Sequence, residues 1–209
     1  MALAAFATIW RTGAAGGARA FFAFALGSAI LAPGVYFGLQ ALQSPLVSDI
    51  TTDLEDPPRF TVAGSERSRG DNAVTYDRAN APVQLRFYPT VHPLVTDVPP
   101  EDMRKLILEL IRERRWRLVA DTPLTTPDSP GRVPVRSPVG RVEAVAHTLV
   151  LGLEDDIAIR LRDDGGRTRV DMRSASRVGR IDFGVNARRV MDFLEDLRTR
   201  ALIPVQATQ

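Results

Sequence analysis

The sequence predicts an α+β fold: an antiparallel sheet of about four to five strands with two helices on one face, preceded by an N-terminal transmembrane helix. Three observations predict it: an uncharged apolar stretch near the amino terminus, two segments with helical apolar periodicity, and several short alternating segments. A chain of 209 residues, 44% of them hydrophobic, is long enough for one domain and an appendage.

The uncharged apolar stretch lies near the amino terminus. Residues 20–43 contain no charged side chain, and a helix of about 20 such residues spans the hydrocarbon core of a bilayer. We therefore expect a transmembrane helix here, with residues 1–19 in the cytoplasm or at the membrane interface. A cleaved signal peptide is the alternative, because Gly27-Ser28-Ala29 offers small residues at a possible cleavage position.

The flanking charges predict the orientation of this helix. Arg11 and Arg19 precede it, whereas residues 43–58 contain no Arg or Lys and carry several acidic residues. The positive-inside rule therefore places the amino terminus in the cytoplasm and the following domain outside it. In a bacterium this describes a single-pass inner-membrane protein with a periplasmic domain.

Composition divides the remaining chain into three parts. Residues 44–82 are expected to form a linker or an extended wrap, because Pro57-Pro58 and scattered glycines disfavour regular structure. Residues 83–203 are expected to form the α+β domain, and residues 204–209 a tail.

The strands are expected where polar and apolar residues alternate. These segments are 83–88, 115–120, 142–151, 157–162 and 168–176. The last two are joined by Asp163-Asp164-Gly165-Gly166, which predicts a hairpin because glycine readily adopts positive φ. Glu154-Asp155-Asp156 is expected to form another tight turn, and five prolines between Asp121 and Gly140 predict an irregular loop.

Two amphipathic helices complete the predicted domain. Pro99-Pro100 followed by Glu101 and Asp102 is typical of a helix start. The apolar residues that follow share one helical face: Met103, Leu106, Ile107, Leu110 and Ile111. A second helix is expected from Phe183 to about Ala201, with Asp182 as its cap.

Strand alternation sorts the meander residues onto two faces. The face expected to meet the helices carries Ile157, Ile159, Leu161, Val170, Met172, Ser174 and Ser176. The opposite face carries Arg160, Arg162, Arg169, Asp171, Arg173 and Arg177. We interpret it as a solvated face with cross-strand ion pairs.

The corner from Arg177 to Gly184 is the candidate binding site. It joins the last strand to the last helix, and its glycines and free helix amides suit a carboxylate, a phosphate or a lipid head group. The arginines of this region, including Arg188, are expected to converge there. The candidate ligand-binding or partner-binding residues are Arg173, Ser174, Ser176, Arg177, Gly179, Arg180, Asp182, Asn186 and Arg189.

Four segments carry a family resemblance. They are VQLRFYPTVHPL at 83–94, VEAVAHT at 142–148, DDIAIR at 155–160 and TRVDMRSASRVGRIDFGVNARRV at 168–190. Together they resemble the bacterial and plastid domain-of-unknown-function family 1499 over roughly residues 50–200. Its motif RSxSRxGxxDxGxNxxR falls on Arg173, Ser174, Ser176, Arg177, Gly179, Asp182, Gly184, Asn186 and Arg189. The resemblance implies a membrane-anchored protein without an assigned activity.

Composition argues against several classes of function. Lys105 is the only lysine among 27 basic residues, and 25 acidic residues are interspersed with them, which disfavours nucleic acid as a partner. The absence of cysteine excludes disulfides and thiolate metal sites. His92 and His147 lack metal-ligand spacing, so neither a metal nor a cofactor is expected.

The leading hypothesis is a non-enzymatic, membrane-anchored envelope protein that serves as an accessory or structural component of a membrane-protein complex. Membrane lipid and the other subunits of that complex are then its expected partners. One alternative is binding of an anionic, lipid-like ligand at the arginine-rich corner. A second is a hydrolase that would use Ser174 or Ser176 with His147 and Asp171, although neither serine lies in a nucleophile elbow.

Overall fold

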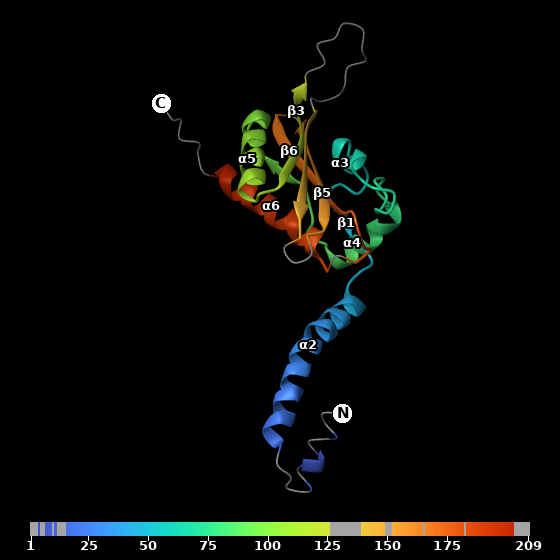
Figure 1. Ribbon diagram of the computed structural model, residues 1–209. Helices are drawn as coiled ribbons and strands as arrows, with labels where there is room; N and C mark the ends of the chain where they lie inside the picture. Colours follow the sequence, from blue (N-terminus) through green and yellow to red (C-terminus); the bar gives the residue numbers. More distant parts are fainter. Residues whose placement is uncertain are drawn as a thin grey trace. The chain divides into compact units, whose positions relative to one another are not determined.

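The computed structural model describes residues 16–125, 139–148, 152–164, 166–181 and 183–202, together with a few residues before Gly16 (Figure 1). The chain divides into two compact units, residues 1–44 and residues 45–209.

The first unit contains α2, a helix from Gly17 to Gln43 that includes Pro33. Its window of highest hydropathy has a mean value of 1.8, and within the part of the chain that the structure describes it is the one helix long and apolar enough to cross a membrane. A signal sequence meets the same requirement, so length and composition leave both interpretations of this helix open.

The second unit is built on a six-stranded sheet in which every pairing is antiparallel. The strands are β1 (Asp49–Thr51), β2 (Leu94–Thr96), β3 (Arg117–Thr125), β4 (Val139–His147), β5 (Glu154–Asp164) and β6 (Arg167–Ser176). They lie in the order β1-β6-β5-β4-β3, and β2 also pairs with β6. The antiparallel α+β prediction is therefore confirmed, with β1 and β2 as strands that alternation did not predict because each has only three residues.

Two helices cover one face of the sheet, which we call the inner face. They are α5 (Pro100–Glu113) and α6 (Val185–Leu202), which contact each other and the strands (Figure 1). The core between the helices and the inner face is fully buried at positions such as Ile107, Ile157 and Phe193. Trp116 stacks on Phe193 with ring centroids 5.2 Å apart. Burial of one apolar stripe per helix explains why both periodic segments fold as predicted.

The strand expected at residues 83–88 is wrong, because these residues lie in a helix. The segment forms α4 (Ala81–Phe87), which has proline in its first turn and directly follows the short 3-10 helix η1 (Arg78–Asn80). Alternation over six residues does not distinguish a strand from a short helix. Gln84 is the buried residue of α4, and it exchanges hydrogen bonds with the backbone N–H and C=O of Thr51.

Turns in the meander were predicted in part. Residues 163–166 do join β5 to β6, and Gly166 has φ +88° while its N–H bonds to the Asp163 carboxylate. Glu154-Asp155-Asp156 does not form a turn but begins β5, since the chain reverses nearer Gly152, at φ +63°. Most of the proline-rich loop expected at 121–140 lies outside the described residues, and its first residues, through Thr125, belong to β3.

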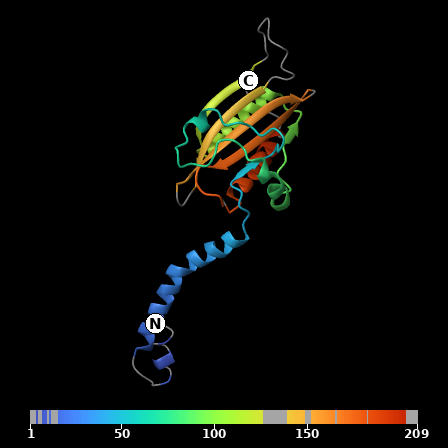
Figure 2. The same cartoon turned by 90° about the vertical axis from the view of Figure 1, so that its right-hand side faces the viewer.

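The face opposite the helices, which we call the outer face, is covered and not solvated. Residues 52–80, which we call the strap, run across it and include α3 (Val62–Ser65) (Figure 2). Phe60 and Ala63 of the strap pack on Ala158 and Ala175 of the outer face. The solvated-face interpretation is wrong because the strap supplies partners to the arginines, and Asp171 and Arg173 are 0% and 2% exposed.

Candidate functional site

The RSxSR motif of β6 is divided between the two faces of the sheet. Ser174 and Ser176 are buried toward α6, whereas Arg173 and Arg177 extend under the strap. Alternation along a strand requires this separation. The predicted convergence of the arginines at one corner therefore does not occur, and the motif forms separate clusters.

The first cluster surrounds Arg173. Its Nε and one terminal nitrogen donate to the two carboxylate oxygens of Asp49, at 2.9 and 2.7 Å. The guanidinium also lies 4.4 Å from the ring centroid of Phe60 and 5.5 Å from that of Tyr76. Arg173 thus fixes β1 and two parts of the strap at once.

The second cluster surrounds Arg177. It donates to Asp156 at 2.8 Å, to Glu66 at 3.1 Å and to the Glu154 carboxylate. Arg67 of the strap donates to the other oxygen of Asp156 at 2.7 Å. Hydrogen bonds from Arg117, and then from Arg177, lower the pKa of Glu66 to about 2. Charge-assisted bonds of this kind hold the strap to β5 and β6.

The third cluster lies at the other end of the outer face. Arg160, Arg162 and Arg169 all lie within 3.5 Å of Asp53 and within 3.2 Å of Asp171. Burial of Asp53 acts to raise its pKa, but hydrogen bonds from Asp56 N–H and Arg162 and the nearby charges lower it overall. The predicted cross-strand pairs therefore form, with a strap carboxylate joined to them.

The inner half of the motif forms a polar cluster around Asn186 at the start of α6. The Ser174 hydroxyl donates to the Asn186 side-chain oxygen at 2.6 Å, and the Asn186 amide donates to Ser176 at 2.8 Å and to Ser48 C=O at 3.0 Å. Arg189 bonds to Ser174 at 2.9 Å and to Asp155 at 2.6 Å. The cluster joins α6 to β6 and to the residue before β1.

The corner itself keeps fewer candidate residues than predicted. Gly179 adopts φ +87°, its C=O accepts a bond from Ser48 Oγ at 3.1 Å, and Arg180 is exposed. Arg188 is exposed on α6 and is not drawn into the clusters described above. Asp182, which we expected to cap α6 and to contribute to the site, lies outside the described residues. Of the candidate cations, Arg180 remains available at the corner.

The serines and the histidine of the hydrolase alternative lie on opposite faces of the sheet. Ala144 and Ala146 belong to the inner core, so His147, the next residue of β4, points to the outer face. His147 Nε2 lies 3.3 Å from Glu154, whereas Ser174 and Ser176 bond to Asn186. The Ser–His contact that this hydrolysis needs is absent from the described residues.

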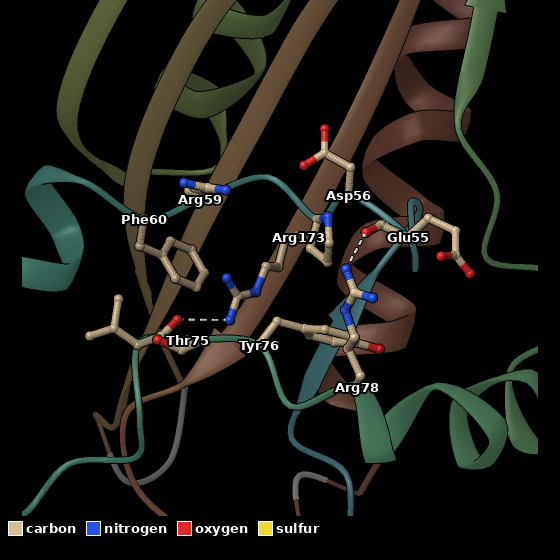
Figure 3. Close-up of a pocket in the computed structure, with 10 residues that line it drawn as sticks. Glu55, Asp56, Arg59, Phe60, Thr75, Tyr76, Arg78 and Arg173 are labelled. Atoms are coloured by element: carbon tan, nitrogen blue, oxygen red, sulfur yellow. Dashed lines mark hydrogen bonds between the residues drawn. The ribbon is translucent and has the colours of Figure 1, made fainter.

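A hollow of about 440 Å³ opens on the outer face between two parts of the strap (Figure 3). Two parts of the strap and Arg173 of β6 line it. The strap residues are Glu55, Asp56, Pro57, Arg59 and Phe60 on one side and Val74, Thr75, Tyr76 and Arg78 on the other. A second hollow of about 330 Å³ lies beside it, shares Asp56 and Arg59, and reaches Arg141. No group of three or more His, Asp or Glu residues in the described part of the chain could hold a metal ion.

A comparison with protein families matches the part of the chain that holds these clusters. The family model described as protein of unknown function DUF1499 matches residues 49–197. The chain belongs to the DUF1499 family. The resemblance predicted from the motif is thereby confirmed, and in this DUF1499 protein the matched span begins at the first residue of β1 and ends inside α6. No curated protein matches the chain.

Sequence reasoning missed the strap residues that complete the DUF1499 clusters. Glu143 is the clearest case: it is 2% exposed and accepts bonds from the backbone N–H of Thr61 and Ala63, both at 2.9 Å, and from the Thr61 hydroxyl. The sequence did offer one indication that Glu143 is buried and bound by donors, because it is the one carboxylate inside the apolar stretch VEAVA. A buried carboxylate needs donors, and here the start of α3 provides them.

Proposed function

We propose that this DUF1499 protein is a single-pass, membrane-anchored envelope protein that serves as an accessory or structural component of a membrane-protein complex. The observation that carries the proposal is α2. Its large apolar side chains are exposed along the whole helix, with Phe22 at 77% and Leu42 at 84%. An apolar surface of this length is stable when lipid or another helix covers it.

The small residues of α2 support contact with another helix. Gly27, Gly34 and Gly38 fall on one side of the helix, and a Cβ at any of them would meet nothing within 4 Å. Glycines placed in this way let helix backbones approach closely in a membrane. The proposed partner is therefore a transmembrane helix of a second protein.

The domain supports a binding role more than a catalytic one. Its clustered arginines are ion-paired to carboxylates of the same chain, and its serines are separated from His147. These groups act as a scaffold. A scaffold that holds the strap on the sheet presents a fixed surface to a partner.

Co-purification tests the proposal. The tagged full chain is isolated in mild detergent beside two variants, Gly34→Leu on the glycine side of α2 and Ala25→Leu on the opposite side. We expect Gly34→Leu to lose the membrane proteins that accompany the parent chain, because leucine blocks close helix approach. Ala25→Leu adds similar bulk and should retain them. Equal recovery with both variants would contradict helix-mediated assembly.

The proposed orientation places the domain in the periplasm. It rests on Arg11 and Arg19 before α2 and on the acidic residues after it. A reporter enzyme that is active only in the periplasm, fused after Gln209, should be active. An inactive reporter, with a cytoplasmic reporter active at the same position, would reverse the orientation.

The corner supplies a specific observation for the second candidate function, binding of anionic lipid. Arg180 has no carboxylate within 4.0 Å among the described residues, and the exposed apolar side chains of Val178, Phe183 and Val185 lie near it in sequence. A cation beside apolar side chains suits the surface of an anionic membrane.

The absence of cysteine permits a direct test of this candidate. A polarity-sensitive dye on Val178→Cys is compared with the same dye on Leu118→Cys, an exposed position of β3. In nanodiscs containing phosphatidylglycerol, the Val178 dye should report a less polar environment than in phosphatidylcholine alone. The polarity reported by the dye at Leu118→Cys should be the same in both lipid compositions. No lipid dependence at Val178 would remove the lipid candidate.

A further inference from the structure

We propose that the 440 Å³ hollow of the outer face is a binding site for a phosphate group, carried by a small soluble ester or by a lipid head group. This inference is independent of the helix-mediated assembly proposed above. It rests on the charges, the donors and the shape of the hollow.

Two arginines at the hollow lack the carboxylate partners that the neighbouring arginines have. Arg59 and Arg78 are exposed, and neither lies within 4.0 Å of an acidic side chain among the described residues. Arg78 makes one bond, to the backbone C=O of Glu55 at 3.2 Å. Within the described residues, the donors of Arg59 and the other donors of Arg78 therefore remain available for an anion.

The balance of charge in the lining is positive once internal pairs are removed. Arg173 is paired with Asp49, and Asp56 is bound by Arg160 at 2.7 Å. Of the charged groups that remain in the lining, Arg59 and Arg78 are positive and Glu55 is negative. In Figure 3 the Glu55 carboxylate extends away from Arg59 and Arg173, which leaves that side of the hollow cationic.

Tyr76 adds a donor without an acceptor. Its side chain lines the hollow, and its hydroxyl is buried without a hydrogen-bond partner in the part of the chain that the structure describes. Buried hydroxyl groups are normally satisfied, so an unsatisfied one beside a cavity indicates a missing acceptor. We infer that a phosphate oxygen of the bound ligand is this acceptor.

The shape of the hollow favours a phosphate ester over a bare ion. A volume of about 440 Å³ exceeds what one phosphate fills, and Phe60 and Tyr76 add apolar wall beside the polar groups. Two guanidinium groups can each bind phosphate oxygens in a bidentate manner. We therefore expect a phosphate held by Arg59 and Arg78, with a small organic group along the aromatic walls.

Titration of the full chain in neutral detergent tests the site. Isothermal calorimetry with glycerol 3-phosphate is carried out on the parent chain and on Arg59→Gln, Arg78→Gln and Arg69→Gln. Arg69 is exposed in the same strap but does not line the hollow, so its variant controls for lost charge. We expect about tenfold weaker binding for each of the first two variants and unchanged binding for the control. Equal weakening in all three would overturn the proposal.

A second arm distinguishes the two sources of phosphate. If the parent chain does not bind glycerol 3-phosphate, nanodiscs containing phosphatidylglycerol should raise its thermal midpoint relative to phosphatidylcholine, and Arg59→Gln and Arg78→Gln should remove this shift. Such a result assigns the site to a lipid head group. Absence of both responses, or responses that both arginine variants retain, would overturn the proposal.

Tyr76→Phe separates a ligand-binding role from a structural one. The substitution removes a hydroxyl that has no partner, so the unliganded variant should unfold at the same temperature as the parent or higher. Its affinity for the responding phosphate compound should nevertheless fall several-fold. Unchanged affinity would remove Tyr76 from the site, and unchanged affinity in Arg78→Gln as well would overturn the site itself.

Discussion

Arg173 of β6 and Asp49 of β1 form a two-point ion pair across 124 positions of sequence, with N–O distances of 2.9 and 2.7 Å. The same guanidinium donates to Val74 C=O at 2.9 Å and to Pro58 C=O at 3.3 Å. One motif arginine therefore binds the first strand of the domain and both segments of the strap that border the 440 Å³ hollow. The motif of this DUF1499 protein organises the strap as well as the sheet.

We expect Arg173→Ala to lower the free energy of unfolding by about 3–5 kcal/mol, because it leaves the Asp49 carboxylate without its partner under the strap. Arg173→Lys should be intermediate, since lysine cannot reproduce the two-point contact. Urea unfolding in detergent measures both. Arg69→Ala, at an exposed position without a partner among the described residues, should change stability by about 0.5 kcal/mol or less. Similar losses of stability for Arg173→Ala and Arg69→Ala would contradict the structural role assigned to the Arg173–Asp49 ion pair.

Asn186→Ala should lower stability by about 2 kcal/mol or more. Asn186 is 0% exposed, and its loss leaves Ser48 C=O and two serine hydroxyls without bonds that they now make. Chemical unfolding measures the cost. Asn80→Ala provides the comparison, because the hydrogen bond from Asn80 to Asp77 C=O is donated by the backbone N–H of Asn80 and survives the substitution. A cost below that of Asn80→Ala would show that the cluster around Asn186 does not stabilise the fold.

Two corner glycines should respond differently to alanine. Both have positive φ, +87° at Gly179 and +77° at Gly184, which costs an alanine about 1 kcal/mol. A Cβ at Gly184 would also lie 3.2 Å from the hydroxyl of Tyr88, whereas at Gly179 the nearest atom is 4.0 Å away. Thermal unfolding should therefore rank Gly184→Ala as the more destabilised variant. Gly70→Ala, where a Cβ meets nothing within 4 Å, should be close to neutral.

Stability should fall between pH 4.5 and about 2 because of Glu66, whose pKa is lowered from 4.5 to about 2 mainly by the hydrogen bond from Arg117. A lowered pKa in the folded state gives stability that is complete above the unfolded value and is lost as pH falls through the folded value. Urea midpoints across this window should decline less steeply in Glu66→Gln. Part of the decline should persist, because Asp53 also has a lowered pKa. An equally steep decline in Glu66→Gln would contradict the assignment.

Much of the sheet and both core helices follow from local sequence. Ile157 pairs with Ser174, Ile159 with Met172 and Leu161 with Val170, so these residues share one face of the sheet, as the alternation predicted. This succeeds because each of these strands buries one face against a helix, so its pattern is strict. The segment at 83–88 fails because its helix is selected by Pro82 and by the contact of Gln84 with Thr51, which is 33 positions away.

The covered outer face could not be predicted in the same way. Alternation placed Arg160 and Asp171 on the correct face, but it does not show what lies above that face. The strap reaches Arg160 from Asp56 across 104 positions, and its sequence has the prolines and glycines of a linker. The carboxylates of that segment, Asp53, Asp56 and Glu66, together with Asp49 of β1, were the indication, because charged strand residues need partners when they are buried.

Native mass spectrometry of the full chain, released from mild detergent, tests most directly the claim that this is a component of a membrane-protein complex. We expect a discrete assembly heavier than the 22.9 kDa chain, retained in Ala25→Leu and lost in Gly34→Leu. Recovery of the parent chain as a free monomer, under conditions that preserve known membrane complexes from the same preparation, would contradict it.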